Sequence, residues 1–306
     1  MPAIVNIAAY KFVTLSELPR RRDAMRTLTL RLGLKGTILL SEEGINLFLA
    51  GTREAIDAFL AALRHEPTFA GLDVKESMSD RQPFTRMLVR IKKEIIAFGV
   101  DRIDPRRKSS PRVSPKDLKQ WLDEGRAVTL LDTRNDYEVK IGTFENALPA
   151  GIEDFRHFPD AAARLPEELK ERPLVTFCTG GIRCEKASSY MMDQGFDEVY
   201  HLQGGILKYL ENIPESESMW QGECFVFDQR VAVKHGLAVG EYDQCYACRH
   251  PLSPEELLSE KYTPGISCPH CYDKTSEEKK ASLTERQKQV ILAKQRGETH
   301  IGEKQK

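Results

Sequence analysis

The residues with the clearest capacity for chemistry lie in one short run, residues 174–186. A mainly apolar, strand-forming run ends at Cys178. Gly180 and Gly181 follow, and helix-forming residues begin directly afterwards. This order predicts a strand, a tight loop and the first turn of a helix. Such a loop leaves backbone N–H groups unpaired, and these groups and the helix dipole stabilise an anion between them. We therefore expect the pKa of the Cys178 thiol to lie well below the usual value of about 8.5.

The loop after Cys178 is expected to complete a reactive site. Arg183 would add a fixed cation, and glycines let the backbone approach the sulfur without a Cβ in the way. The N–H groups would come from the four loop residues, Thr179, Gly180, Gly181 and Ile182. The alternative is a buried structural cysteine, because unpaired cysteine is among the most buried residue types. The glycines and the arginine favour the reactive thiolate, since a core cysteine needs neither.

The cysteine, the four loop residues and Arg183 resemble the active-site loop of rhodanese domains, in which the first cysteine carries a persulfide. Two flanking segments share the resemblance. The upstream one contains Asp132, Thr133, Arg134, Glu138 and residues 142–147. The downstream one contains Gly195, Phe196, Val199, Leu202, Gly204, Gly205 and Ile206. Asp132 and Arg134 are expected to support the site structurally, and Thr143 departs from the histidine that many rhodaneses place there.

A longer string resembles a narrower family. Residues 178–187, read with the sequence Phe-Val-Phe-Asp at 225–228 and the paired cysteines behind it, are similar to the bacterial tRNA uridine(34) hydroxylases. This resemblance implies that tRNA is the partner and that molecular oxygen converts its wobble uridine to 5-hydroxyuridine. We expect the Cys178 thiolate to add to C6 of an unstacked uridine, which costs less in a single-stranded anticodon loop. Loop N–H groups and Arg183 would then stabilise the oxyanion that forms on the base.

Three other functions compete with hydroxylation. A rhodanese-type sulfurtransferase would hold a Cys178 persulfide in the same pocket. A phosphatase is disfavoured, because the phosphatases built on the rhodanese fold resemble this loop with one residue more. An inactive rhodanese serving as an RNA-binding or scaffolding module is disfavoured by the intact loop. Cys184 could resolve a modified Cys178, although its place in the first helical turn favours a structural role that points away from the pocket.

The length of 306 residues predicts two or three domains. No apolar run approaches the roughly 18 residues of a membrane span, and the start of the chain lacks the features of a secretory signal. Seven cysteines, several in CxxC pairs, suit thiol and metal chemistry better than a disulfide framework. We therefore expect a cytoplasmic protein without membrane contact. No organic cofactor is evident, and any donor of sulfur or electrons is unidentified.

The net charge of −1 hides an uneven distribution. Residues 1–112 contain 20 Lys and Arg against 13 Asp and Glu, whereas residues 113–222 contain 12 against 20. A basic domain beside an acidic catalytic domain suits the binding of a polyanion, although an ordinary solvated surface explains the asymmetry equally well. The proposed tRNA contacts are the basic residues Arg86, Arg90 and Lys92. The alternative for this segment is a charged strand that protects a sheet edge.

The fold is expected to be α/β with three parts. Residues 1–100 alternate as βαββαβ, which predicts a ferredoxin-like or acylphosphatase-like α+β domain, followed by an extended segment at 87–98. Residues 101–113 form a polar linker. Residues 114–222 form a rhodanese domain with parallel strands at 128–132, 174–177 and 198–202. Residues 223–306 form a cysteine-rich, zinc-ribbon-like module and a charged tail with one helix at 284–296.

The cysteine-rich module contains two CxxC pairs separated by 19 residues. Its four cysteines are Cys245, Cys248, Cys268 and Cys271. This spacing fits a tetrahedral Zn²⁺ site, and four thiolates would close the coordination shell, so the metal would be structural. The alternatives are an empty ribbon and disulfides that form on isolation.

Overall fold

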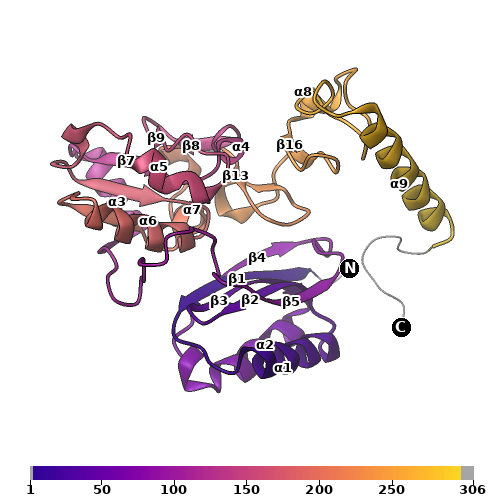
Figure 1. Cartoon of the computed structure of the whole chain (residues 1–306), viewed down its shortest axis with the longest axis horizontal. Coiled ribbons are helices and arrows are strands. Elements are labelled where there is room, and N and C mark those ends of the chain that lie inside the picture. The colour runs from indigo at the N-terminus through magenta and orange to yellow at the C-terminus, as the bar shows by residue number, and fades with distance from the viewer. Residues whose placement is uncertain (1–2, 298–306) are drawn as a thin grey trace.

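The computed structural model describes residues 3–297, which form three units in chain order (Figure 1). The expectations for Met1, Pro2 and the tail beyond residue 297 lie outside these residues. The α/β class and its division into a mixed N-terminal sheet, a parallel rhodanese-like sheet and a C-terminal cysteine cluster are confirmed.

The first unit is a five-stranded sheet with two helices on one face (Figure 1). Its strand order, β4-β1-β3-β2-β5, is the predicted ferredoxin-like arrangement, extended at one edge by β5, which pairs in parallel with β2. The elements are β1 (Ile4–Phe12), α1 (Leu18–Arg31), β2 (Lys35–Ser41), β3 (Gly44–Gly51), α2 (Arg53–Arg64), β4 (Val74–Ser79) and β5 (Met87–Ile91). The segment predicted as extended over 87–98 is therefore a strand in its first five residues alone.

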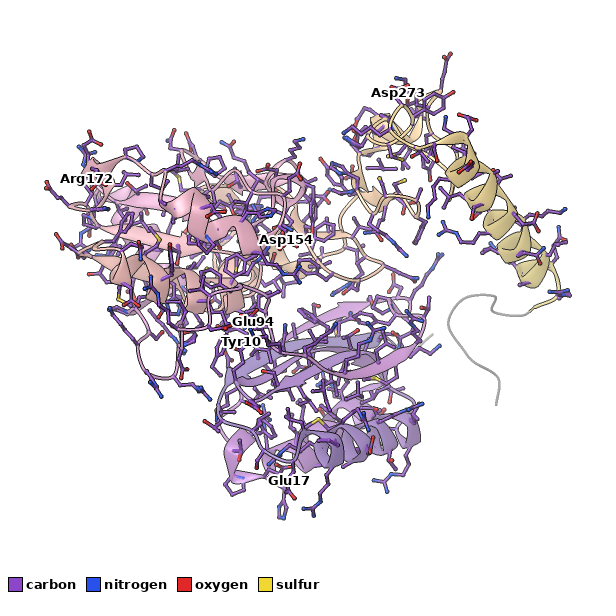
Figure 2. The ribbon with its side chains drawn as sticks, viewed as in Figure 1. Tyr10, Glu17, Glu94, Asp154, Arg172 and Asp273 are labelled. Carbon is purple, nitrogen blue, oxygen red and sulfur yellow. The ribbon has the colours of Figure 1, made fainter. Side chains whose placement is uncertain are left out.

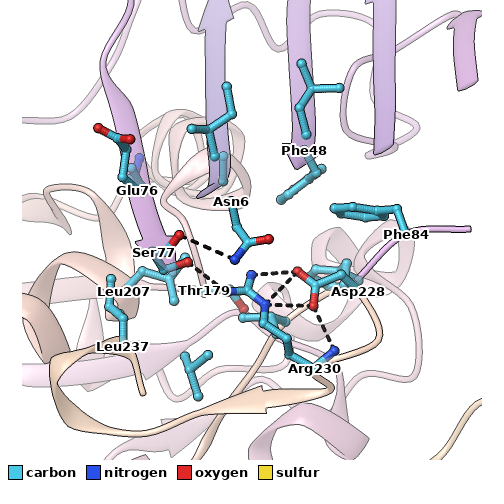
Figure 3. A pocket seen from close by; sticks show the side chains of 17 residues that line it. Asn6, Phe48, Glu76, Ser77, Phe84, Thr179, Leu207, Asp228, Arg230 and Leu237 are labelled. Carbon is cyan, nitrogen blue, oxygen red and sulfur yellow. Dashed lines mark hydrogen bonds and ion pairs between the residues drawn. The ribbon is translucent and has the colours of Figure 1, made fainter. Parts of the chain in front are cut away.

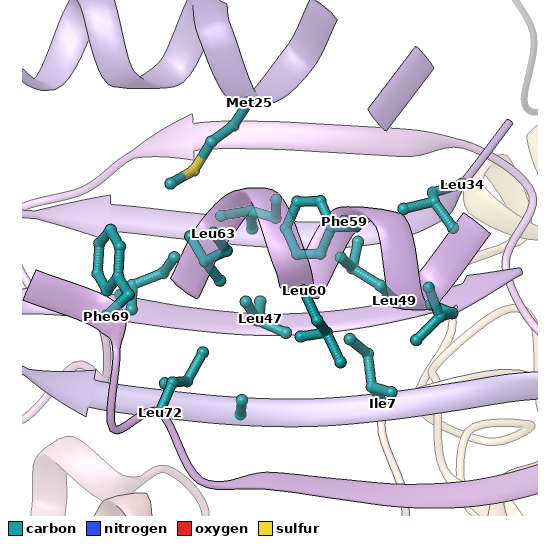
Figure 4. Packing of buried hydrophobic residues seen from close by; sticks show 14 of the residues in the cluster. Ile7, Met25, Leu34, Leu47, Leu49, Phe59, Leu60, Leu63, Phe69 and Leu72 are labelled. Carbon is teal, nitrogen blue, oxygen red and sulfur yellow. The ribbon is translucent and has the colours of Figure 1, made fainter. Parts of the chain in front are cut away.

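Alternation along the strands gives this sheet two different faces. In β1 and β3, odd-numbered residues such as Ile7, Leu47 and Leu49 face α1 and α2 and form the domain core (Figure 4). Even-numbered residues of these two strands, such as Tyr10 and Phe48, lie on the opposite face, which meets the rest of the chain. The N-terminal domain thus completes its own hydrophobic core with one face of the sheet, and the opposite face is available to contribute side chains to a site.

The second unit has a parallel sheet of order β6-β11-β10-β7-β9 with helices on both faces. Its helix α3 begins as predicted, with the Ser114 hydroxyl accepting the Asp117 N–H. Side chains of α3 and α7 pack on one face, and those of α5 and α6 pack on the other. The elements are β6 (Arg112–Val113), α3 (Pro115–Asp123), β7 (Thr129–Asp132), α4 (Asp136–Val139), β8 (Gly142–Phe144), β9 (Leu148–Pro149), α5 (Phe158–Ala162), β10 (Leu174–Phe177), α6 (Ile182–Asp193), β11 (Val199–Leu202) and α7 (Gly205–Asn212).

The core of this second unit continues past residue 223, the predicted start of the cysteine-rich module. Cys224, Val226 and Val233 are buried in the same cluster as β10 and α7, because this segment folds back against the rhodanese sheet. The elements here are β12 (Trp220–Gly222), which pairs with β8, and the hairpin of β13 (Cys224–Phe225) and β14 (Ala232–Val233).

The third unit holds the four CxxC cysteines and ends in a long helix (Figure 1). Its elements are β15 (Asp243–Gln244), β16 (Pro251–Leu252), α8 (Pro254–Leu257) and α9 (Glu277–Gln295). The helix expected at 284–296 begins seven residues earlier, because the Ser276 hydroxyl caps it by accepting the Lys279 N–H. Within residues 3–297, no helix combines the length and the apolar character that crossing a membrane requires.

Candidate active site and metal centre

Cys178 is fully buried at the carboxyl end of β10, the central strand of the rhodanese sheet. The loop curls around its sulfur: the Gly181 N–H donates to Sγ over 3.1 Å, and the N–H groups of Arg183 and Cys184 act on it as donors. Gly181 has a φ of 96°, which only glycine adopts without strain. At Gly205, which packs on the loop, a Cβ would lie 2.4 Å from the Cys178 carbonyl oxygen. The glycines therefore allow the close approach that the sequence predicted.

The surroundings of Cys178 favour its thiolate. Burial alone would raise the pKa, but the Cys184 thiol, the charge of Arg183 and the loop N–H groups outweigh burial and lower the pKa of Cys178. Burial and the neighbouring Cys178 raise the pKa of Cys184 well above its ordinary value. Cys178 is thus the anion of the pair and Cys184 the donor. Cys184 also contacts Thr133 Oγ1 at 3.8 Å and does not line the cavity. Its thiol nevertheless faces the Cys178 sulfur, so its structural role stays a prediction.

Arg183 is held by Glu138, a partner that sequence reasoning did not assign to it. Its two terminal nitrogens donate to the two Glu138 carboxylate oxygens over 2.6 and 2.7 Å. Glu138 also accepts from the Thr179 hydroxyl and the Asn135 N–H, and both charged side chains are buried. Arg183 therefore still lines the cavity, but its two terminal nitrogens are engaged in a bidentate ion pair rather than free to bind a substrate oxyanion.

Asp132 and Arg134 have the structural role expected of them. Arg134 donates from Nε and Nη2 to the Asp132 carboxylate over 2.9 and 2.6 Å, and both side chains are completely buried. Thr143, which replaces the histidine of many rhodaneses, donates its hydroxyl to the same carboxylate over 2.9 Å. This pair fixes the end of β7 beside the loop but lies outside the wall of the Cys178 cavity.

A cavity of about 240 Å³ lies over the Cys178 loop, and its opposite wall is the free face of the N-terminal sheet. Tyr10, Asn46, Phe48 and Lys75 from that sheet face the loop residues 178–183. Tyr10 is visible at the junction of the two units in Figure 2. None of these four residues was assigned to the site from the sequence, although the alternation of Asn6, Ala8 and Tyr10 marks a face of β1 that differs from its core face.

The Phe-Val-Phe-Asp motif at 225–228 wedges between the rhodanese core and the N-terminal sheet. Phe227 lines the cavity and lies against Phe48, with ring centroids 6.3 Å apart. Asp228 holds Arg230 in an ion pair of 2.6 Å, and Arg230 donates to Ser77 Oγ on β4 over 2.7 Å (Figure 3). The motif therefore joins the two units along one side of the Cys178 cavity.

Glu185 and Lys186 join the same two units on the other side. Lys186 is buried and donates to Glu43 and Glu94 of the N-terminal domain over 3.0 and 2.7 Å. Glu185 accepts from the Tyr10 hydroxyl over 3.2 Å and from Arg112 over 2.8 Å. Both side chains point into the domain interface, because helix α6 lies directly against the N-terminal domain.

The basic residues proposed to contact tRNA lie apart from the cavity. Arg86, Arg90 and Lys92 are exposed on and beside β5, at one edge of the N-terminal sheet. Phe84, the aromatic residue closest to them in the sequence, lines two cavities that also involve Phe227.

The sulfur atoms of the four CxxC cysteines all lie within 4.8 Å of one another. Cys268 Sγ lies 3.7 Å from both Cys248 Sγ and Cys271 Sγ. Zn–S bonds of about 2.3 Å in a tetrahedron separate the sulfurs by about 3.8 Å, so the cluster has the dimensions of a zinc site. Four thiolates would hold the metal and leave no position open, which fits a structural role.

We expect one zinc per chain in freshly purified, reduced protein, measured by elemental analysis. Cys268→Ser should lower both the zinc content and the stability of the C-terminal module, because the folding free energy of such modules comes largely from metal binding. Cys178→Ser is the matched control and should retain the metal. Wild-type protein without zinc would refute this prediction.

Comparison with protein families assigns the first two units. Residues 4–95 match the UPF0176 acylphosphatase-like domain, and residues 114–212 match the rhodanese-like domain. The two domains in this order are the architecture of one family. This chain belongs to the UPF0176 family. The resemblance seen in the sequence is thereby confirmed at the level of domain architecture, and the acylphosphatase-like and rhodanese-like folds of the UPF0176 chain are those expected.

Solved structures similar to this UPF0176 protein contain rhodanese domains. A rhodanese-like domain from Anabaena is 24% identical, covering 37% of this chain and 80% of its own, with a TM-score of 0.30. A rhodanese-like domain protein from Staphylococcus aureus is 24% identical, covering 32% and 90%, with a TM-score of 0.28. The human single-domain sulfurtransferase is 25% identical, covering 34% and 99%, with a TM-score of 0.30.

Proposed function

We propose that this UPF0176 protein is a tRNA-modifying enzyme that hydroxylates the wobble uridine to 5-hydroxyuridine with molecular oxygen, and that Cys178 is its reactive thiolate. The observation that carries the proposal is the position of the thiolate, which faces a cavity walled by a second domain. A cavity of about 240 Å³ is smaller than the roughly 300–1,000 Å³ of sites for drug-sized ligands, and it suits a single base. An aromatic wall of Tyr10, Phe48 and Phe227 suits the face of that base.

The proposed reaction begins with nucleophilic addition. The thiolate of Cys178 attacks C6 of a uridine that has left the anticodon stack, and the electron density gained at C5 makes this carbon reactive toward oxygen. Hydroxylation at C5 takes one atom of O₂, and the second atom leaves as water when a cellular reductant supplies two electrons and solvent supplies two protons. Loss of the C5 proton then breaks the S–C6 bond, which restores the C5–C6 double bond and releases the Cys178 thiolate. The buried loop supports the first step, because it holds the sulfur as an anion away from bulk water.

Mass spectrometry of tRNA nucleosides tests the proposal. A strain that lacks the gene should lose 5-hydroxyuridine and regain it when the gene is restored. Loss of a thiolated uridine would instead assign the protein to sulfur transfer, and no change in any nucleoside would assign it to a non-enzymatic role.

The second candidate is a rhodanese-type sulfurtransferase with a persulfide on Cys178. The ring of N–H groups around the sulfur favours it, since the same donors would stabilise a persulfide anion. A small sulfur donor, however, has no need of the N-terminal wall of the cavity. Substrate size therefore separates the two candidates.

Binding of tRNA is proposed to use the exposed basic edge of the N-terminal domain. Reversing the charge at Arg86, Arg90 and Lys92 should weaken tRNA binding and make its salt dependence shallower by roughly one unit per lost phosphate contact. The measurement is tRNA affinity against salt concentration for the wild type and the triple variant. The thiol-alkylation rate of Cys178 and any thiosulfate sulfurtransfer should stay unchanged, because both need the rhodanese loop alone.

The matched control reverses three arginines on α1, on the far side of the same sheet. Arg20, Arg26 and Arg31 are exposed there, so this variant carries the same change in net charge. It should bind tRNA nearly as well as the wild type. If tRNA affinity depends equally on salt in the wild type and in the Arg86, Arg90 and Lys92 variant, the tRNA contact surface lies instead on the linker or the cysteine-rich module.

A further inference from the structure

Two cationic side chains line the Cys178 cavity, and they differ in how they are paired. Arg183 gives both terminal nitrogens to the buried Glu138 carboxylate. Lys75, which enters from β4 of the N-terminal domain, makes no hydrogen bond and no ion pair with any residue in 3–297. Its ammonium lies 5.4 Å from the centroid of the Tyr10 ring, whose face partly stabilises it.

The position of Lys75 follows from the register of the sheet. It pairs with Ala8 of β1, so it shares the face of the sheet that carries Tyr10 and looks toward the rhodanese loop. Burial lowers the pKa of Lys75, while the charges of Asp73 and Cys178 act in the opposite direction. Lys75 is half-buried, and a partly desolvated ammonium without a hydrogen-bonding partner in the protein carries a free-energy cost. Such groups cluster at functional sites, where a ligand completes the pairing.

We propose that Lys75 is a catalytic residue that stabilises the enolate oxygen formed when Cys178 adds to the uridine; this inference rests on the proposed function. The N-terminal domain would then supply a catalytic cation in addition to binding tRNA. Lys75 also replaces Arg183 in the role that the sequence suggested for it.

The addition step is balanced without an oxidant. A sulfur lone pair forms the S–C6 bond, the C5–C6 π pair becomes the C4–C5 π bond, and the C4 carbonyl π pair moves onto O4. The negative charge leaves Sγ and arrives on O4, where the Lys75 ammonium receives it. No electron is gained or lost overall. The ammonium needs only to donate a hydrogen bond to O4, without transferring its proton.

Arg183 is poorly placed to take the same role. Turning its guanidinium toward O4 would leave the Glu138 carboxylate buried and unpaired, and that is among the costlier changes in a protein interior. Lys75 has no such partner to lose. A fixed donor that meets charge as it develops contributes most to the transition state, so the unpaired cation is the better candidate.

The test is covalent trapping on an anticodon stem-loop RNA that carries 5-fluorouridine at the wobble position. Full-length wild type should form an adduct that survives on a denaturing gel. At saturating RNA, Lys75→Met should form it about 100-fold more slowly, the size expected for loss of one oxyanion donor. Lys75→Arg should recover much of the rate, and RNA affinity and the iodoacetamide alkylation rate of Cys178 should change little in both variants.

The control is Lys208→Met, which removes a nearby lysine that is already paired with Glu211 at 2.8 Å. It should form the adduct at the wild-type rate. A wild-type rate for Lys75→Met would overturn the inference, and so would an equal fall in adduct formation and alkylation, since Lys75 would then act on the thiolate. If wild type restores 5-hydroxyuridine in cells but gives no adduct, the role of Lys75 fails and the proposed function stands. If it restores none, the proposed function fails first.

Discussion

Cys178→Ser should abolish 5-hydroxyuridine formation while leaving the fold intact. The hydroxyl is a far weaker nucleophile than the thiolate, and serine and cysteine are nearly isosteric. The surrounding N–H groups and the charge of Arg183 are arranged for a sulfur anion, and a serine hydroxyl remains protonated among them. The measurement is nucleoside mass spectrometry of tRNA from a deletion strain that carries the variant, beside the thermal unfolding of the purified protein.

Cys224→Ser is the control for this substitution. Cys224 is buried in the rhodanese core and does not line the cavity, and burial raises its pKa to about 12, so its thiol stays protonated. The control strain should keep the modified nucleoside. Full modification by the Cys178→Ser strain would remove this cysteine from the mechanism altogether.

Glu138→Ala should be the most destabilising single change near the site, costing about 3–5 kcal/mol of unfolding free energy. It leaves the Arg183 guanidinium buried without its bidentate partner and removes acceptors from the Thr179 hydroxyl and the Asn135 N–H. The free energy of unfolding is measured by urea denaturation monitored by circular dichroism. The alkylation rate of Cys178 should change as well, because the Arg183 side chain is no longer held in place.

One further variant separates charge from shape at position 138, and a second serves as a surface control. Glu138→Gln keeps the size of the side chain and should cost less than Glu138→Ala. Glu168→Ala removes an exposed acid from the same domain and should leave stability within about 0.5 kcal/mol of the wild type. If Glu138→Ala lowers the unfolding free energy by less than about 1 kcal/mol, water or a rearranged loop replaces the carboxylate as the partner of Arg183.

Local patterns were enough to predict the elements and the reactive loop. The strand ending at Cys178, the glycines and the helix of Arg183 are contiguous, so their geometry follows from neighbouring residues. The Thr52 cap of α2 is equally local, since the Thr52 hydroxyl accepts from the Ala55 N–H three residues later. At the start of α1, Ser16 has the residue type that favours a cap, yet the cap position belongs to Glu17, which has a φ of 52° and no capping side-chain bond. Such a competition between adjacent residues depends on how the chain enters the helix.

Ion pairs between residues far apart in the chain could not be predicted from a single sequence. Glu138 and Arg183 are 45 positions apart, and Lys186 and Glu43 are 143 apart. Nothing in the residue types says which of many acids a given cation meets, since that depends on how the domains dock. The same holds for Lys75: its place on β4 is predictable, but its approach to Cys178 exists only once the two sheets face each other.

The buried Lys186, whose acidic partners both lie in the N-terminal domain, has a consequence for folding during synthesis. The core of that domain closes with β5, so it can fold while the rhodanese part is still being made. At 5–20 residues per second, residue 186 follows Ile91 by about 5–20 s. Throughout that interval the face that carries Tyr10, Asn46 and Lys75 is exposed to solvent, which its polar groups tolerate. One wall of the Cys178 cavity is thus folded before the Cys178 loop, which forms the other wall, has been synthesised.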